Sequence, residues 1–157
     1  MESKILSREA MKTERDRMKK AGKTLVFTNG CFDILHVGHA AYLDFARRQG
    51  DALIVGVNAD ASVKTYKDPS RPIVPQDERA RMVAALECVD YVVIFDEPEP
   101  KELIAAILPD VLVKGRDWAH YVSGREIVEA NGGRVVLADL VPGRSTSEII
   151  RKIKETS

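Results

Sequence analysis

Two histidines three residues apart, His36 and His39, are the side chains in this sequence best suited to chemistry. On the first turn of a helix, residues at this spacing share a face, so both imidazoles can point at one ligand. Gly38 lies between them, and Gly30 precedes them at the end of an apolar run. Both glycines let a ligand approach the backbone, and a helix N-terminus carries unpaired N–H groups and a partial positive charge. The pattern therefore favours a site for phosphate oxygens.

Two other interpretations of this segment stay open at the level of sequence. Asp33, His36 and His39, together with Cys31, carry groups that bind metals, although catalytic zinc sites usually show a more specific spacing and a defined third ligand. The histidines could also do no more than satisfy hydrogen bonds near a strand end. We favour phosphate binding, because two histidines and two glycines gather in one short segment after a predicted strand.

The surrounding sequence alternates between apolar runs and stretches with helical spacing. The runs are continuous, which is typical of parallel strands buried on both faces. They cover 24–28, 52–57, 91–95, 111–113 and 135–137. Apolar residues at helical spacing follow each of the first four runs. This order predicts an α/β fold, with a Rossmann-like, doubly wound and mainly parallel sheet of about five strands, in a single domain over residues 1–157.

Capping residues and composition predict several boundaries. A charged leading helix is expected within residues 1–22, with Ser7 as its N-cap. Asp77 is predicted to cap a later helix, on which Arg79 is expected at the surface or against another helix. Residues 66–72 have the composition of a loop.

Further candidates follow the second strand, at the sheet edge where doubly wound folds bind ligands. Asn58 and Lys64 come directly after this strand, and Lys67 and Arg71 lie in the adjacent loop. A lysine here could place its charge on a phosphate, and the loop could close over a phosphorylated ligand. Solvated surface residues are the alternative, and local sequence does not decide between the two.

The start of the last predicted helix has two compatible interpretations. Ser145 and Glu148 have the spacing of a capping box, so these side chains could simply begin a helix. A helix N-terminus rich in hydroxyl groups and reached through Gly143 is also suited to the phosphates of a nucleoside triphosphate.

These motifs together resemble a known family. His36-Val37-Gly38-His39 is similar to the H-x-G-H signature of the nucleotidyltransferase superfamily. Thr28–His39 resembles, more narrowly, the T-N-G-C-F-D-x-L-H-x-G-H segment of the D-glycero-β-D-manno-heptose 1-phosphate adenylyltransferases. Lys114–Trp118 resembles their K-G-x-D-[YW] segment, and Val141–Ser147 resembles V-P-G-x-S-T-[ST]. The last position is serine where threonine is common.

The resemblance extends from about Lys4 to Ile153 and implies a role for each matched residue. The implied catalytic residues are His36, His39 and Lys64. The residues implied to bind the nucleotide are Thr28, Asn29, Gly30, Cys31, Phe32, His36, Gly38, His39, Lys114, Gly115, Asp117, Ser145, Thr146 and Ser147. Those expected to bind the second substrate are Asp33, Asn58, Lys64, Lys67 and Arg71. Asp33 could instead orient a histidine or Mg²⁺.

The implied reaction transfers AMP from ATP to D-glycero-β-D-manno-heptose 1-phosphate and releases pyrophosphate. The acceptor phosphate is already ionised near neutral pH, so catalysis needs no general base and depends on positioning and charge stabilisation. Mg²⁺, held by the phosphates rather than by the protein alone, is the expected cofactor. The resemblance alone implies a homodimer in the bacterial cytoplasm. Some family members are fused to a sugar kinase, and we expect a separate kinase here.

Two alternatives remain at this stage. A cytidylyltransferase for a polyol phosphate such as glycerol 3-phosphate would share H-x-G-H. Those enzymes carry R-T-E-G-I-S-T-T where this chain has Leu140–Ser147, and Y-G-T-F-D where it has Asn29–Asp33. A nucleotide-binding module without turnover is the second alternative, although such a module would not need His36, His39 and Lys64.

Composition argues against several other classes of protein. Across 157 residues, 24 Lys and Arg balance 24 Asp and Glu, whereas proteins that bind duplex nucleic acid usually have a basic face. No apolar run approaches the ~20 residues of a membrane helix, and no signal-peptide core follows Met1. Cys31 and Cys88 lie far apart and are expected to be reduced thiols. We therefore expect a soluble enzyme without nucleic-acid or membrane partners.

Overall fold

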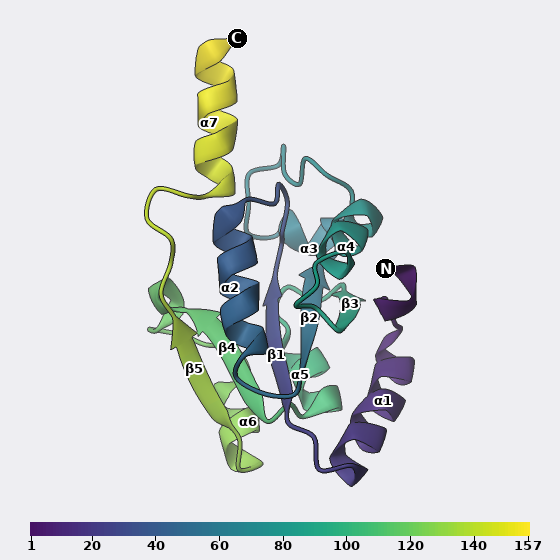
Figure 1. Cartoon of the computed structure of the whole chain (residues 1–157). Helices are drawn as coiled ribbons and strands as arrows, with labels where there is room; N and C mark the ends of the chain where they lie inside the picture. The colour runs from purple at the N-terminus through teal and green to yellow at the C-terminus, as the bar shows by residue number, and fades with distance from the viewer.

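The computed structural model describes residues 1–157 and contains one sheet of five parallel strands (Figure 1). The strands are β1 (Leu25–Gly30), β2 (Ala52–Asn58), β3 (Tyr91–Phe95), β4 (Val111–Gly115) and β5 (Arg134–Ala138). Their order in the sheet is β3-β2-β1-β4-β5. The predicted α/β fold is thereby confirmed, and each strand lies within about two residues of its predicted bounds.

Seven α-helices and two short 3₁₀ helices connect and flank the strands. The α-helices are α1 (Arg8–Lys20), α2 (Val37–Arg47), α3 (Asp60–Val63), α4 (Gln76–Ala84), α5 (Lys101–Ile107), α6 (Arg125–Ala130) and α7 (Thr146–Thr156). The 3₁₀ helices are η1 (Glu2–Lys4) and η2 (Arg116–Trp118). None of these helices has the length and apolar composition needed to cross a membrane.

Both faces of the sheet are covered by helices. On one face, Leu43 of α2 and Val83 of α4 pack into a core with side chains of β1, β2 and β4. On the other face, Met11 of α1, Ile104 of α5 and Val128 of α6 form a second core. Because the strands are buried from both sides, their sequences are continuous apolar runs. In contrast, α7 projects from the body of the domain and has no buried residue (Figure 1).

Local sequence explains some helix boundaries but not all. Ser7 Oγ accepts a hydrogen bond from Ala10 N at 3.1 Å, which confirms the predicted N-cap of α1. The predicted cap at Asp77 is wrong, because α4 begins at Gln76, directly after Pro75. Asp77 lies in the first turn instead, where its carboxylate interacts favourably with the helix dipole.

The centre of the sheet contains the point at which the strand order reverses. β1 pairs with β2 through six register pairs along its whole length. Its pairing with β4 has only two register pairs, the last of which is Phe27↔Leu112. β1 and β4 therefore separate toward their carboxyl ends, and we call the space between them the β1–β4 fork. In doubly wound sheets this switch point is where ligands bind.

Candidate functional site

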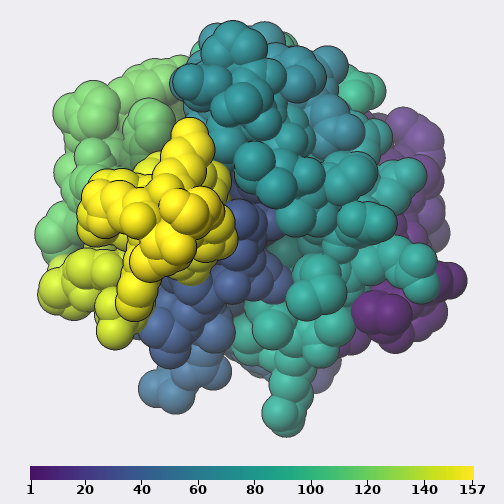
Figure 2. Space-filling view, turned by 90° about the horizontal axis from the view of Figure 1, so that it is seen from above, coloured from purple at the N-terminus to yellow at the C-terminus, as the bar shows by residue number.

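A cavity of about 670 Å³ opens at the β1–β4 fork, next to the N-terminal ends of α2 and α7. Figure 2 looks onto this end of the molecule, where α7 stands beside the start of α2 and the segment after β2. Most of the predicted site lines the cavity, namely Asn29, Gly30, Cys31, Phe32, Asp33, His36, Gly38, His39, Lys67, Arg71, Lys114, Gly115, Asp117, Ser145, Thr146 and Ser147. Tyr42, Trp118 and Arg144 also line it.

Three predicted residues do not line the cavity. Thr28 and Asn58 are buried in the strands that lie beneath it. Lys64 Nζ donates hydrogen bonds to the carbonyls of Pro69 and Arg71 at 3.3 and 3.2 Å. In this structure Lys64 therefore holds the loop that follows α3, and its role in catalysis stays a prediction.

The two histidines cap the start of α2 with one nitrogen each. His36 Nδ1 accepts a hydrogen bond from Gly38 N at 3.0 Å, and His39 Nδ1 accepts from His36 N at 3.3 Å. This reciprocal arrangement pairs two N–H groups at the helix start. Because each Nδ1 is an acceptor, each neutral ring carries its proton on Nε2. The capping geometry thus leaves both Nε2–H groups as donors on rings that line the cavity.

The surroundings of the histidines keep them uncharged. Burial lowers the pKa of His39 to about 4, and the positive charges of His36 and Lys67 act in the same direction. Burial also lowers the pKa of His36, with a further contribution from Arg144. The ring centroids lie 3.9 Å apart. Near neutral pH the cavity therefore offers two preorganised neutral donors, which suits oxygens that gain charge during a reaction.

Asp33 fastens the loop before α4 to the end of β1. Its carboxylate accepts hydrogen bonds from Ile73 N and Val74 N, each at 2.9 Å, and pairs with Arg71 Nε at 2.9 Å. Burial by itself would raise the pKa of Asp33, but these three partners outweigh it and lower the pKa. Asp33 and Arg71, both predicted to contact substrate, are thus engaged with each other in this structure.

Arg79 is a residue of the site region for which the sequence left two positions open. The surface position is wrong, because the side chain is fully buried, and the position against another helix is right, because the side chain pairs with Asp60 of α3. Its guanidinium donates to the carbonyls of Cys31 and Val74 at 2.7 and 2.8 Å and pairs with Asp60 Oδ1 at 2.8 Å. Arg79 therefore joins the end of β1 to α3 and to the loop before α4. The spacing of four from buried Val83 is a sequence signal that could have placed it on the inner face of α4.

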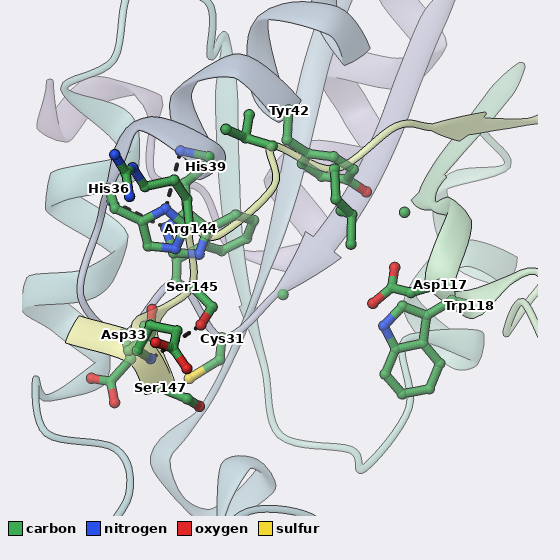
Figure 3. A pocket seen from close by; sticks show the side chains of 18 of the residues that line it. Cys31, Asp33, His36, His39, Tyr42, Asp117, Trp118, Arg144, Ser145 and Ser147 are labelled. Carbon is green, nitrogen blue, oxygen red and sulfur yellow. Dashed lines mark hydrogen bonds between the residues drawn. The ribbon is translucent and has the colours of Figure 1, made fainter. Parts of the chain in front are cut away.

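The wall of the cavity formed by β4 and η2 combines a cation with an aromatic ring. Lys114 Nζ lies 5.6 Å from the centroid of the Trp118 ring and 3.4 Å from Asn29 O. Burial lowers the pKa of Lys114 to about 8, against the opposing effect of the Asp117 carboxylate. Figure 3 shows Asp117 and Trp118 across the cavity from the two histidines. A half-exposed indole at this position is suited to contact with a planar base.

The start of α7 completes the side of the cavity that holds the histidines. Ser145 Oγ accepts from Glu148 N at 3.1 Å, so the predicted helix cap is confirmed. Thr146 Oγ1 donates to Ile34 O at 3.0 Å and fastens the start of α7 to the segment before α2. Two helix N-termini therefore face one cavity, and the dipoles of both helices add partial positive charge there.

The competing interpretations of the histidine segment can now be compared with its geometry. No group of three or more His, Cys, Asp or Glu side chains in residues 1–157 gathers in a way that could hold a metal ion. The hydrogen-bonding interpretation is correct for one nitrogen of each ring, because both Nδ1 atoms cap α2. The second nitrogen of each ring is the one available to a ligand.

The sheet is doubly wound, and the cavity at its switch point is formed by two helix N-termini, neutral histidines and cations. These features define an α/β domain whose cavity is suited to phosphate groups. Residues 27–152 match the family described as Cytidylyltransferase-like, and the chain belongs to this family.

Curated relatives have the same name in several bacteria. The chain is 54% identical over 153 residues to the "Bifunctional protein HldE" of Syntrophotalea carbinolica, covering 97% of the chain and 31% of that relative. It is 56% identical over 136 residues to the protein of this name in Geobacter sulfurreducens, covering 86% of the chain and 28% of that relative. The chain thus spans about a third of the length of the curated relatives it matches.

Solved structures share the fold. A lipopolysaccharide core biosynthesis protein from Thermoplasma volcanium superposes with a TM-score of 0.64 at 25% identity, covering 76% of this chain and 98% of that one. A pantothenate synthetase from Thermus thermophilus gives a TM-score of 0.61 at 16% identity, covering 87% of this chain and 62% of that one. The second likeness bears on the fold alone.

Proposed function

We propose that the domain transfers AMP from ATP to D-glycero-β-D-manno-heptose 1-phosphate, giving ADP-heptose and pyrophosphate. The resemblance of Thr28–His39 to the heptose 1-phosphate adenylyltransferases supports this choice, as does the name shared by its close relatives. The main structural support for this reaction is the pair of neutral histidine donors, which line the cavity beside the N-terminus of α7.

In the proposed reaction, an oxygen of the acceptor phosphate attacks the α-phosphorus of ATP in line with the bond to pyrophosphate, which breaks as the new P–O bond forms. The Nε2–H groups of His36 and His39 donate to oxygens of the group in transfer as charge grows on them. The N-terminus of α7 and the hydroxyl of Ser145, which keeps its proton because it accepts from Glu148 N, hold the departing pyrophosphate. Lys67, which has no carboxylate partner and lines the cavity, supplies positive charge.

Mg²⁺ is the proposed cofactor, and the donors present fit an ion held mainly by substrate. Asp33 is engaged with Arg71, and the Glu148 carboxylate pairs with Arg151, so the cavity has no ready cluster of carboxylates. Ser147 and Asp117 could add oxygen ligands to an ion carried in with the phosphates. When bound, such an ion neutralises charge on the phosphates and helps pyrophosphate to leave.

A cytidylyltransferase acting on a polyol phosphate is the second candidate. The description of the matching family favours it, since that description names cytidylyl transfer. The two candidates differ in the base and in the acceptor, while the phosphate chemistry of the histidines would be the same.

A panel of substrates tests these candidates directly. Pyrophosphate release is measured with ATP, CTP, GTP and UTP, each against heptose 1-phosphate and glycerol 3-phosphate. We expect kcat/KM for ATP to exceed that for CTP by at least about tenfold, because a site shaped for a purine is poorly filled by a pyrimidine. EDTA should abolish turnover and Mg²⁺ should restore it. Preference for CTP with glycerol 3-phosphate would establish the second candidate, and no release from any pair would leave a binding module without turnover.

The assembly and location of the protein are also part of the proposal. The resemblance to the heptose family supports a homodimer in the bacterial cytoplasm. Light scattering on the purified chain measures the mass in solution, and a mass of one chain would contradict the dimer.

A further inference from the structure

The hydroxyl of Tyr42 joins β1 to β4 where the backbone pairing between these strands ends. Tyr42 Oη donates to Val113 O at 3.0 Å and lies 2.6 Å from Thr28 Oγ1. Because the tyrosine proton is used on the carbonyl, the threonine hydroxyl must donate to Tyr42 Oη. Thr28 and Val113 each follow the last register pair, Phe27↔Leu112, by one residue. A side chain from α2 therefore spans the two strands at the base of the fork.

This bridge is partly buried and lies beside the cavity. Burial raises the pKa of the Tyr42 hydroxyl, and the Asp117 carboxylate acts in the same direction. Thr28 is fully buried, yet Tyr42 itself contributes to the lining of the cavity. Losing either hydroxyl would leave a buried polar group with fewer partners, which is costly in such surroundings.

The position of Tyr42 on α2 connects the fork to the histidines. Tyr42 follows His39 by three residues on the same helix, so the two side chains share a face. Figure 3 shows Tyr42 between the histidines and the pair formed by Asp117 and Trp118. The strand ends that it joins lead directly to Asn29 on β1 and Lys114 on β4, which line the cavity from opposite sides of the fork.

We propose that Tyr42 is a positioning residue that fixes the width of the β1–β4 fork and thereby sets the fit of the nucleotide base. The proposal rests on the proposed function for the assignment of this end of the cavity to the base. With the hydroxyl bridge in place, the fork has one width, and a base of the wrong size leaves gaps or unpaired groups. Without the bridge, the longer contact of Lys114 Nζ with Asn29 O at 3.4 Å is left across the fork, so the strand ends can adjust more readily to either base and discrimination falls.

Removal of single hydroxyl groups tests the proposal with little change in shape. The variants are Tyr42→Phe, Thr28→Val and the double variant. Tyr91→Phe is the matched control, because Tyr91 Oη donates to Glu14 Oε2 at 2.9 Å and Tyr91 does not line the cavity. Calorimetry gives the dissociation constants of ATP and CTP without acceptor, and hydrogen exchange reports on the amides of residues 29–31 and 114–115.

We expect Tyr42→Phe to narrow the ratio of CTP to ATP dissociation constants about fivefold, the usual effect of one lost hydrogen bond. The amides at the fork should exchange faster in Tyr42→Phe than in Tyr91→Phe. In Tyr91→Phe the ratio of dissociation constants should equal that of the unmodified chain. Thr28→Val should act in the same direction, and the double variant should be no worse than Tyr42→Phe, because both hydroxyl groups belong to one bridge.

The two measurements separate failure of this proposal from failure of the proposed function. If the unmodified chain binds neither nucleotide, the proposed function is wrong. If the fork amides exchange no faster in Tyr42→Phe than in Tyr91→Phe, the hydroxyl bridge does not hold the fork and the present proposal is overturned. Faster exchange with an unchanged ratio would show that the bridge holds the fork without setting the fit of the base, which overturns the proposal. If Tyr42→Phe does not fold, Thr28→Val decides by the same two criteria.

Discussion

Replacing His39 with asparagine separates its two roles. The amide oxygen of asparagine occupies nearly the same place as Nδ1, so it can still accept from His36 N, a contact of 3.3 Å in the structure. Asparagine has nothing in place of Nε2, so the donor to the ligand is lost. His39→Gln does the reverse, because its amide nitrogen reaches toward the position of Nε2. His39→Ala removes both groups.

The expected magnitudes follow from these contacts. Loss of one preorganised donor to a developing charge costs ~10²–10³ in kcat, so His39→Asn should fall by that amount. Because its capping contact is kept, its Tm should change by less than ~2 °C. His39→Ala should lose the same activity and also about 1 kcal/mol of folding free energy from the lost cap, which lowers the Tm by ~2–4 °C for a chain of this size. His39→Gln should retain more activity than either variant.

Steady-state pyrophosphate release and calorimetric unfolding, measured on the same preparations, provide both quantities. The interpretation of His39 as a donor in the transition state would be refuted by an asparagine variant with full activity. Loss of activity in proportion to loss of folded protein would equally assign His39 to the fold alone.

Three further predictions concern stability. The pKa of His39 is lowered to about 4 on folding from about 6.5 in the unfolded chain, so the unfolded chain binds more protons between these values. The stability due to neutral His39 is therefore fully present above pH 6.5 and is lost as the pH falls toward 4. Over this range the Tm should fall less steeply with decreasing pH in His39→Asn than in the unmodified chain. Asp33→Asn should lower the free energy of unfolding, measured with denaturant, by about 3 kcal/mol, because it breaks a buried ion pair and weakens the loop contacts. The exposed Asp139→Asn should lower it by less than ~1 kcal/mol, and equal losses would contradict a structural role for the buried pair. Gly30→Ala places a Cβ 2.9 Å from the Phe32 ring and should destabilise the domain by ~1–3 kcal/mol, and an unchanged Tm would show that the ring moves freely.

Several features of the protein could be predicted from local sequence because they depend on near neighbours. Five continuous apolar runs separated by helical stretches were sufficient to predict the parallel doubly wound sheet, because strands buried on both faces require such runs. Ser7 and Ser145 were identified as caps because a cap bonds to an amide three residues away. The histidine spacing likewise placed both rings at the start of α2, where His36 is the N-cap residue and His39 lies on the first turn.

Contacts between residues far apart in the chain were decided only by the tertiary structure. Aspartate is a residue type that often caps helices, yet α4 begins at Gln76, one residue before Asp77. Arg79 donates to Cys31 O, 48 positions away, Asp33 pairs with Arg71, 38 positions away, and Tyr42 donates to Val113 O, 71 positions away. A single sequence carries no signal for such pairs, because a side chain's partner depends on which strands become neighbours. The short pairing of β1 with β4 opens the cavity. It likewise depends on which strands become neighbours in the folded sheet, so neither strand's own sequence predicts it.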